Sequence, residues 1–183
     1  VNIGVAVAKQ PEKKKTPVTY QYDAVIIGTG PGGEGTAMNL SKNNKKVAVI
    51  ERHEAVGGGC VHWGTIPSKA LRHSVSRYIE YKTNPLFNTG DRLARLTFPD
   101  ILRHASSVIS KQSNLRSSFY DRNRIQMFQG DARFIDKHTV EVTRQDGSTE
   151  RLTAKTIVIA TGSRPYRPPE VDFTHSRIYD SDT

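Results

Sequence analysis

Three glycines with the spacing Gly28-x-Gly30-x-x-Gly33 form the stretch whose chemistry is easiest to identify. This spacing is typical of loops that hold a pyrophosphate. The first glycine permits a tight turn, the second lets the backbone approach the ligand, and the third lets a helix pack closely on a strand. The N–H groups at the start of that helix stabilise an anion by about 0.3–1 kcal/mol, or up to about 2 kcal/mol when partly buried. The stretch therefore predicts a phosphate-binding loop.

The segments around this loop supply the strand, helix and second strand that a dinucleotide site requires. Residues 23–27 form an apolar run, residues 36–43 are compatible with a helix, and residues 47–50 form a second buried-strand run. That run ends at Glu51, about twenty residues beyond the loop, where an acid that binds a ribose hydroxyl is expected. The context predicts a complete βαβ unit that binds a dinucleotide, whereas the glycines alone are equally compatible with a structural turn.

The composition indicates a globular chain without a membrane anchor or a disulfide. The 183 residues are 36% hydrophobic, which is enough for one domain that buries roughly 70% of its unfolded surface. No apolar run approaches the roughly 18 residues of a spanning helix. Cys60 is the single cysteine, which excludes an intrachain disulfide and is typical of a reducing cytoplasm. The net charge of +9 is spread along the sequence, so we expect no nucleic-acid partner.

Residues 1–19 are expected to be a flexible extension that precedes the domain over residues 20–183. Their mildly apolar start is followed by lysines rather than preceded by them, which is the reverse of a secretory signal. The first residue is Val1 and not methionine, which indicates part of a longer translation product.

Two further helices are expected. A second glycine-rich stretch over residues 52–69 admits close backbone approach to a ligand and leads into a helix over residues 68–81, with one apolar face packed inward. Residues 84–85 and 88–90 mark a break. Residues 97–120 form the longest predicted helix, and we interpret its apolar stripe as core rather than as a cofactor lining.

Short β-type runs follow. Residues 125–128, 139–142 and 151–153 predict a small antiparallel insertion, with residues 146–147 as a turn. Residues 155–160 form an apolar strand typical of a buried parallel position in the first sheet. The predicted fold is therefore α/β, a Rossmann-like domain with a parallel sheet, a helical segment and a small antiparallel β insertion.

The order of these motifs resembles the first lobe of the flavoprotein disulfide reductases, the class-I pyridine nucleotide-disulfide oxidoreductases that include glutathione reductase and dihydrolipoamide dehydrogenase. The resemblance covers residues 21–183. After the loop and Glu51 come Gly-Gly-x-Cys at residues 57–60, Pro-Ser-Lys at 67–69 and Ala-Thr-Gly at 160–162. In that family the lobe binds FAD, so the resemblance favours FAD over NAD, although Glu51 suits the ribose of either.

One departure narrows the resemblance. Disulfide reductases of this group carry a second cysteine five residues after the first, and Thr65 stands at that position here. A dithiol cannot shuttle electrons when a hydroxyl replaces one thiol, which disfavours a lipoamide-type reductase. The stretches at residues 57–73 and 172–182 are similar to the soluble pyridine nucleotide transhydrogenase branch. That resemblance implies hydride transfer from NADPH through FAD to NAD⁺, with no thiol intermediate.

The resemblance also assigns roles to individual residues. It implies that Gly28, Gly30 and Gly33 contact the pyrophosphate, and that Glu51 binds the adenosine ribose. The adenine would lie beside Arg52, Gly130 and Ala132. The flavin would be lined by Gly58, Gly59, Cys60 and Lys69, and Thr161 and Gly162 would close over the cofactor. Cys60, Thr65 and Lys69 are the candidate catalytic residues beside the flavin. Cys60 as an unreactive buried thiol and Lys69 as a surface residue are the alternatives. His62, His73 and His175 lack a metal-ligand spacing, so no metal is expected.

The family's nicotinamide-binding domain carries a second Gly-x-Gly-x-x-Gly, and no second copy occurs here. We therefore expect the chain to match the N-terminal part of such an enzyme, without the nicotinamide-binding and interface domains. NADPH and NAD⁺ are the expected substrates, and the whole protein is expected to be a homo-oligomer. A non-catalytic FAD- or dinucleotide-binding module stays open as an alternative.

Overall fold

The structure is a computed structural model that describes residues 19–86 and 97–182. Nearly all of the predicted extension, and the predicted break at residues 88–90, lie outside the described residues. The elements run in the order β1 (Tyr22–Ile27), α1 (Pro31–Lys42), β2 (Val47–Glu51), α2 (Gly58–His62), α3 (Thr65–Thr83), α4 (Phe98–Arg122), β3 (Gln126–Gln129), β4 (Asp131–Asp136), β5 (Thr139–Thr143) and β6 (Thr149–Ile159). In the described ranges, no helix is both long and apolar enough to cross a membrane.

The centre of the fold is a parallel sheet with the strand order β3-β2-β1-β6, which continues into antiparallel β5 and β4. The predicted βαβ unit is confirmed, because β1 and β2 pair in parallel with Val25 opposite Ala48. On its other side β1 pairs in parallel with β6. The predicted parallel pairing is therefore confirmed as far as Ile159, but the predicted burial of residues 155–160 is wrong: none of them is buried, and Ile159 at the strand end is 66% exposed.

Two details of the predicted β structure are wrong. Residues 151–153 and 155–159 belong to one strand, β6, whose first half pairs antiparallel with β5 and whose second half pairs in parallel with β1. Residues 126–128 belong to β3 and pair in parallel with β2 rather than in the antiparallel insertion. The strand opposite β5 is instead β4, which the sequence did not predict. Five of the six residues of β4 are exposed, so it lacks the alternating apolar pattern of a half-buried strand.

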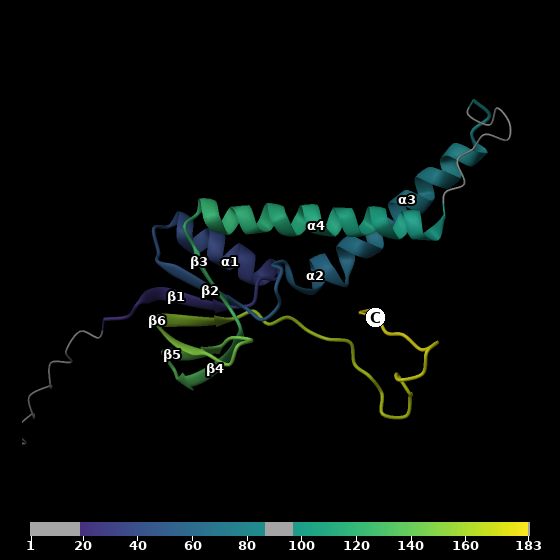
Figure 1. The fold of residues 1–183 in the computed structure, drawn as a ribbon. Helices are drawn as coiled ribbons and strands as arrows, with labels where there is room; N and C mark the ends of the chain where they lie inside the picture. Colours follow the sequence, from purple (N-terminus) through teal and green to yellow (C-terminus); the bar gives the residue numbers. More distant parts are fainter. Residues whose placement is uncertain (1–18, 87–96, 183) are drawn as a thin grey trace, which may run out of the picture.

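The parallel strands separate two apolar cores. One core combines Ile26, Val47 and Val49 with Ala37, Val56, Tyr120 and Ile125 on the helical side. The other combines Tyr22, Val25, Ala48 and Ile50 with Val140, Val142, Leu152 and Ala154 on the antiparallel side. Successive strand residues point to opposite faces, so the continuous apolar runs of β1 and β2 fill both cores. The result is a layer of helices, a parallel sheet and an antiparallel ribbon (Figure 1).

The longest predicted helix is confirmed as α4. It begins after Thr97, whose side chain and Asp100 form a reciprocal capping box, with a proline in the first turn. Its buried residues are Ile101, Ala105 and Tyr120. Other members of the predicted stripe, Phe98, Leu102 and Leu115, are exposed, so only part of that stripe is core.

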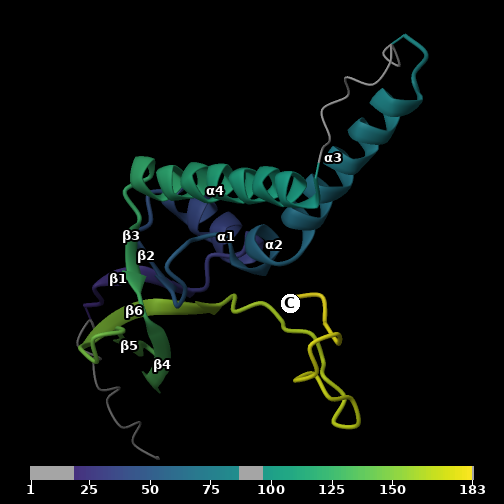
Figure 2. The same ribbon diagram turned by 45° about the vertical axis from the view of Figure 1, so that its right-hand side comes forward.

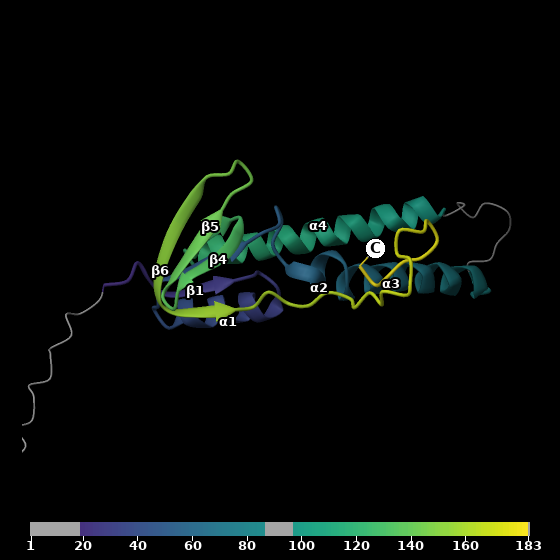
Figure 3. The same cartoon turned by 90° about the horizontal axis from the view of Figure 1, so that it is seen from below.

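The predicted helix over residues 68–81 is confirmed as α3, but its predicted inward packing is wrong. None of its residues is buried, and Val75 and Ile79 are 37% and 54% exposed. The helix contacts chiefly α4 and projects beyond the sheet, as Figures 1 and 2 show. The segment after β6 leaves the sheet in the direction of α2 and α3, which is clearest from below in Figure 3.

Candidate functional site

A cleft of about 1010 Å³ opens where the four parallel strands end. Its lining includes residues 27–31 after β1, residues 50–53 at the end of β2, residues 130–132 after β3 and residues 160–165 after β6, together with parts of α2 and the start of α3. Ligands of parallel sheets bind at the carboxyl ends of the strands. The volume is at the upper end of the roughly 300–1,000 Å³ of ligand pockets, so it suits a long ligand such as a dinucleotide.

The turn from β1 into α1 passes the end of β6 at very short range. Gly28 has a φ of +105°, and a Cβ at this position would lie 2.3 Å from the carbonyl oxygen of Ala160. A Cβ at Gly33, in the first turn of α1, would lie 2.0 Å from the carbonyl oxygen of Gly28. Both positions therefore require glycine. A Cβ at Gly30 would have none of the described atoms within 4 Å, because Gly30 borders the open cleft.

The N-terminus of α1 faces this cleft. The helix begins at Pro31, five residues before the predicted start at residue 36, because a proline is pre-organised for the first helical position. Gly30 is the N-cap, and in the described part of the chain no side chain caps this end. Its first N–H groups and the helix dipole therefore favour an anion. Glu34 in the first turn is paired with Arg116, at 3.4 Å between Oε2 and Nε.

Glu51 is held in place by the groups around it. It is 6% exposed and lines the cleft at the end of β2. Its Oε2 accepts hydrogen bonds from the backbone N–H of Thr29, at 3.1 Å, and from the Thr29 hydroxyl. Its Oε1 accepts from the backbone N–H of His53, at 3.0 Å. A carboxylate has about four lone-pair sites, so these three donors leave room for a ligand hydroxyl.

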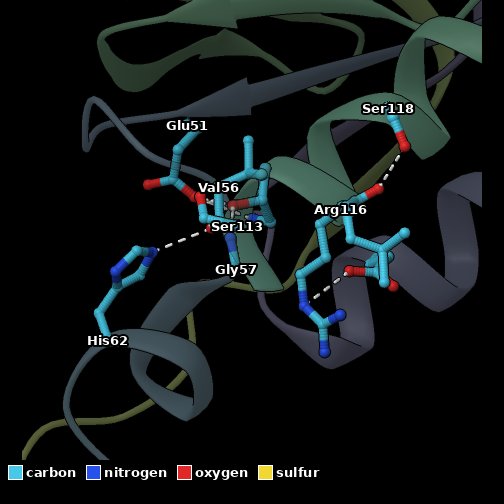
Figure 4. A network of polar contacts seen from close by, with 10 residues as sticks. Glu51, Val56, Gly57, His62, Ser113, Arg116 and Ser118 are labelled. Atoms are coloured by element: carbon cyan, nitrogen blue, oxygen red, sulfur yellow. Dashed lines mark hydrogen bonds and ion pairs between the residues drawn. The ribbon is translucent and has the colours of Figure 1, made fainter. Parts of the chain in front are cut away.

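The loop between β2 and α2 is tied to three other parts of the site. The N–H of Gly57 donates to Thr29 Oγ1, at 3.0 Å. The carbonyl of Val56 accepts from His62 Nε2, at 2.9 Å, and from Ser113 Oγ, at 3.1 Å. Figure 4 shows His62 and Ser113 approaching this loop from α2 and α4. The phosphate loop and both helices therefore fix the second glycine-rich loop.

Arg52 and Asp131 form an ion pair beside Glu51 in the cleft lining. Their Nη2 and Oδ1 atoms are 2.7 Å apart, and their side chains are 53% and 69% exposed. Exposed pairs of this kind contribute about 0–1 kcal/mol, so breaking this pair costs little. His53 and Trp63 add an aromatic pair to the lining, with ring centroids 4.9 Å apart.

Most of the residues that the resemblance assigned to a cofactor lie together in this cleft. The lining contains Gly28, Gly30, Glu51, Arg52, Gly58, Gly59, Cys60, Thr65, Gly130, Ala132, Thr161 and Gly162. Gly33 packs behind the loop, and Lys69 is exposed on α3 and does not belong to the lining. Within the described ranges, no cluster of metal-ligating side chains occurs. The individual roles of these residues toward a cofactor stay predictions.

Several residues that line the cleft were not predicted as site residues from the sequence. Thr29 occupies a variable position of the glycine pattern, and only its bond to Glu51 reveals its place. His53 and Trp63 lie in the second glycine-rich stretch, but no site role was predicted for either residue. Arg167 and Asp180 also line the cleft, and they pair at 2.6 Å between Nε and Oδ2. They come from the segment after β6, whose path no periodicity predicts.

Comparison with known proteins agrees with this geometry. The family model described as pyridine nucleotide-disulphide oxidoreductase matches residues 22–183. The chain belongs to this family. Among curated members, the soluble pyridine nucleotide transhydrogenase of Colwellia psychrerythraea is 64% identical over 165 residues, which are 90% of this chain and 35% of that protein. A protein of the same name from Escherichia coli is 60% identical over 167 residues, 91% of this chain and 36% of that protein.

The chain therefore spans about a third of the length of these curated relatives. A similar solved structure is the HOCl-induced flavoprotein disulfide reductase RclA from Escherichia coli, with a TM-score of 0.71 and 27% sequence identity. The match covers 88% of this chain and 33% of that one. The predicted Rossmann-like fold and the predicted family are thus confirmed.

Proposed function

We propose that this chain is the FAD-binding part of a soluble transhydrogenase that passes hydride from NADPH through FAD to NAD⁺. One observation carries the proposal. A glycine turn, an uncapped helix N-terminus and a buried acid meet in one cleft, in a chain that is 60–64% identical to proteins named soluble pyridine nucleotide transhydrogenase. FAD, when bound, supplies the group that accepts and returns the hydride, and the protein binds and orients it.

The order of the lining residues across the sheet fits FAD. Gly130 follows β3, Glu51 ends β2, Gly28 follows β1 and Thr161 follows β6, and these strands are neighbours in that order. Adenine, ribose, pyrophosphate and flavin follow one another in the same order along FAD. Backbone at Gly130 would meet the adenine, Glu51 the ribose, and the N-terminus of α1 the pyrophosphate. The flavin would then lie near Thr161, beside the half-buried thiol of Cys60.

The residues beside the proposed flavin position favour direct transfer between nucleotides. Cys60 is the single cysteine of the sequence, and Thr65 also lines the cleft. One thiol cannot form the intrachain disulfide that accepts electrons in a disulfide reductase. Hydride that reaches the flavin would therefore leave to a second nicotinamide nucleotide. Lys69 lies outside the cleft lining, so it would act near the flavin only after a change in the exposed helix α3.

We also propose that the whole protein is cytoplasmic and homo-oligomeric. The relatives are named soluble enzymes, and the single cysteine suits a reducing compartment, which supports a cytoplasmic location. α3 exposes Val75 and Ile79, which is compatible with further packing in a larger homo-oligomeric protein.

The test is a chimera in which residues 20–183 replace the matching segment of the Colwellia psychrerythraea relative. We expect the purified chimera to be yellow, to contain equimolar FAD, and to reduce thio-NAD⁺ with NADPH. It should not oxidise dihydrolipoamide. A folded chimera without flavin, or one that binds FAD but transfers no hydride, would contradict the proposal.

The matched variant is Thr65→Cys in the same chimera. It restores the second cysteine of the disulfide reductases without changing the phosphate loop. We expect FAD content to stay the same, so a loss of flavin in this variant would contradict the proposed place of Thr65 beside the flavin.

A further inference from the structure

The hydroxyl of Thr29 occupies a central position that the glycine pattern does not explain. Apart from tyrosines, Thr29 and Glu51 are the two buried polar or charged residues among those that the structure describes, and they are 0% and 6% exposed. These two side chains bond to each other. Burying a polar group is costly unless it is hydrogen-bonded, so this pairing is a built feature of the cleft wall.

The direction of each hydrogen bond at Thr29 is fixed by the chemistry of its partners. A hydroxyl has one proton, and an ionised carboxylate only accepts. Oγ1 therefore accepts from the Gly57 N–H, at 3.0 Å, and donates its proton to Oε2 of Glu51. The backbone N–H of Thr29 donates to the same oxygen at 3.1 Å. The other oxygen, Oε1, receives only the His53 N–H among these contacts, at 3.0 Å.

We propose that Thr29 is a positioning residue that orients the Glu51 carboxylate for the ribose of the dinucleotide. By occupying Oε2 twice, Thr29 leaves Oε1 as the oxygen with the greater free capacity to accept a ribose hydroxyl. The same hydroxyl links Glu51 to the second glycine-rich loop through the buried Gly57. This inference rests on the proposed function, because it requires a dinucleotide in the cleft.

Two variants separate the effect of the Thr29 hydroxyl from the effect of the side-chain shape. Thr29→Val keeps the branched shape but leaves the carboxylate with one donor fewer and the Gly57 N–H without its acceptor. Thr29→Ser keeps the hydroxyl. Thr36→Val is the matched control, because the Thr36 hydroxyl donates to the Gly32 carbonyl within its own helix, at 2.8 Å.

The experiment measures the binding of FAD, ADP and 2′-deoxy-ADP to the 183-residue chain and to these three variants. A hydrogen bond to a charged group corresponds to about 10-fold to 100-fold in affinity. We expect the wild type to prefer ADP over 2′-deoxy-ADP about tenfold or more. Thr29→Ser and Thr36→Val should keep that ratio. Thr29→Val should bring it to within about twofold and weaken FAD binding about 10-fold to 100-fold.

The preference for the ribose hydroxyl separates positioning from a merely structural role. If Thr29→Val is less stable but keeps the wild-type ratio, Thr29 is only structural and the inference is wrong. If Thr29→Val does not fold, Thr29→Cys replaces it, since the weaker thiol donor should give an intermediate ratio, and an unchanged ratio would overturn the inference. A folded wild-type chain that binds neither FAD nor ADP would overturn the proposed function as well.

Discussion

Alanine at Gly28 and alanine at Gly30 should have opposite consequences, although the two positions are two residues apart. At Gly28, alanine meets a φ of +105° and a carbonyl oxygen 2.3 Å from its Cβ. The strained φ costs about 1–2 kcal/mol, and overpacking against backbone adds about 1–3 kcal/mol. The sum of about 2–5 kcal/mol is a large part of the ~5–15 kcal/mol that stabilises a domain.

At Gly30 the backbone already has an ordinary φ of −63°, and its Cβ would project into open space. Alanine there exchanges one N-cap residue for a poorer one, so we expect a loss of less than about 1 kcal/mol in the free energy of unfolding. The new methyl group would instead stand where the pyrophosphate approaches the backbone. FAD affinity should therefore fall about tenfold or more, as for a displaced hydrogen-bonded anion.

Urea unfolding and FAD titration of both variants test this contrast. Gly28→Ala should lower the urea midpoint, and Gly30→Ala should keep it while losing FAD affinity. A Gly28→Ala chain as stable as the wild type would refute the close approach to Ala160. A Gly30→Ala chain that binds FAD as tightly as the wild type would refute the place of the pyrophosphate.

Two further predictions concern groups that the helices bury or cap. The Tyr120 hydroxyl is buried without a hydrogen-bond partner among the described residues, and burial raises its pKa well above the ordinary value. Tyr120→Phe should therefore be neutral or stabilising by about 1 kcal/mol near pH 7 in urea unfolding, and a loss above about 1 kcal/mol would show a hidden partner. Above about pH 10 the Tyr120 hydroxyl ionises in the unfolded chain but stays protonated in the folded chain. The wild type should therefore lose stability above about pH 10 that Tyr120→Phe keeps. Thr97→Ala should lower the free energy of unfolding by about 1 kcal/mol. Hydrogen bonds from Thr97 lower the pKa of Asp100, so this difference should be full above about pH 4 and shrink as the pH falls further; a difference independent of pH from 2 to 7 would contradict the capping box.

The sequence predicts the parts of this fold whose pattern is set by local burial. Residues 24–27 of β1 and 47–50 of β2 are apolar because both faces of these strands are covered, and α4 carries a cap and a helical stripe. β4 could not be predicted, because its exposed residues show no alternation. The exposure of α3 could not be predicted either, since its apolar spacing is that of a packed helix.

The candidate site likewise contains some residues that the sequence predicts and others that it does not. Gly28, Gly33 and Glu51 are recognisable because backbone geometry and ribose chemistry restrict those positions to few residue types. Thr29 and Asp180 are brought to the cleft by tertiary contacts, which leave no periodic signal. Lys69 shows the opposite case: its motif is present, but the helix that carries it turns away from the cleft lining.

The most direct test of the central claim is a titration of the purified 183-residue chain with FAD, followed by flavin absorbance and fluorescence, with ADP as competitor. The cleft should bind FAD with equimolar stoichiometry, ADP should displace it, and Glu51→Ala should weaken it about tenfold or more while the chain stays folded. Saturable binding with this pattern would support a dinucleotide cleft at the ends of the parallel strands. A folded chain that binds no FAD, or binds it equally well without the Glu51 carboxylate, would contradict the account.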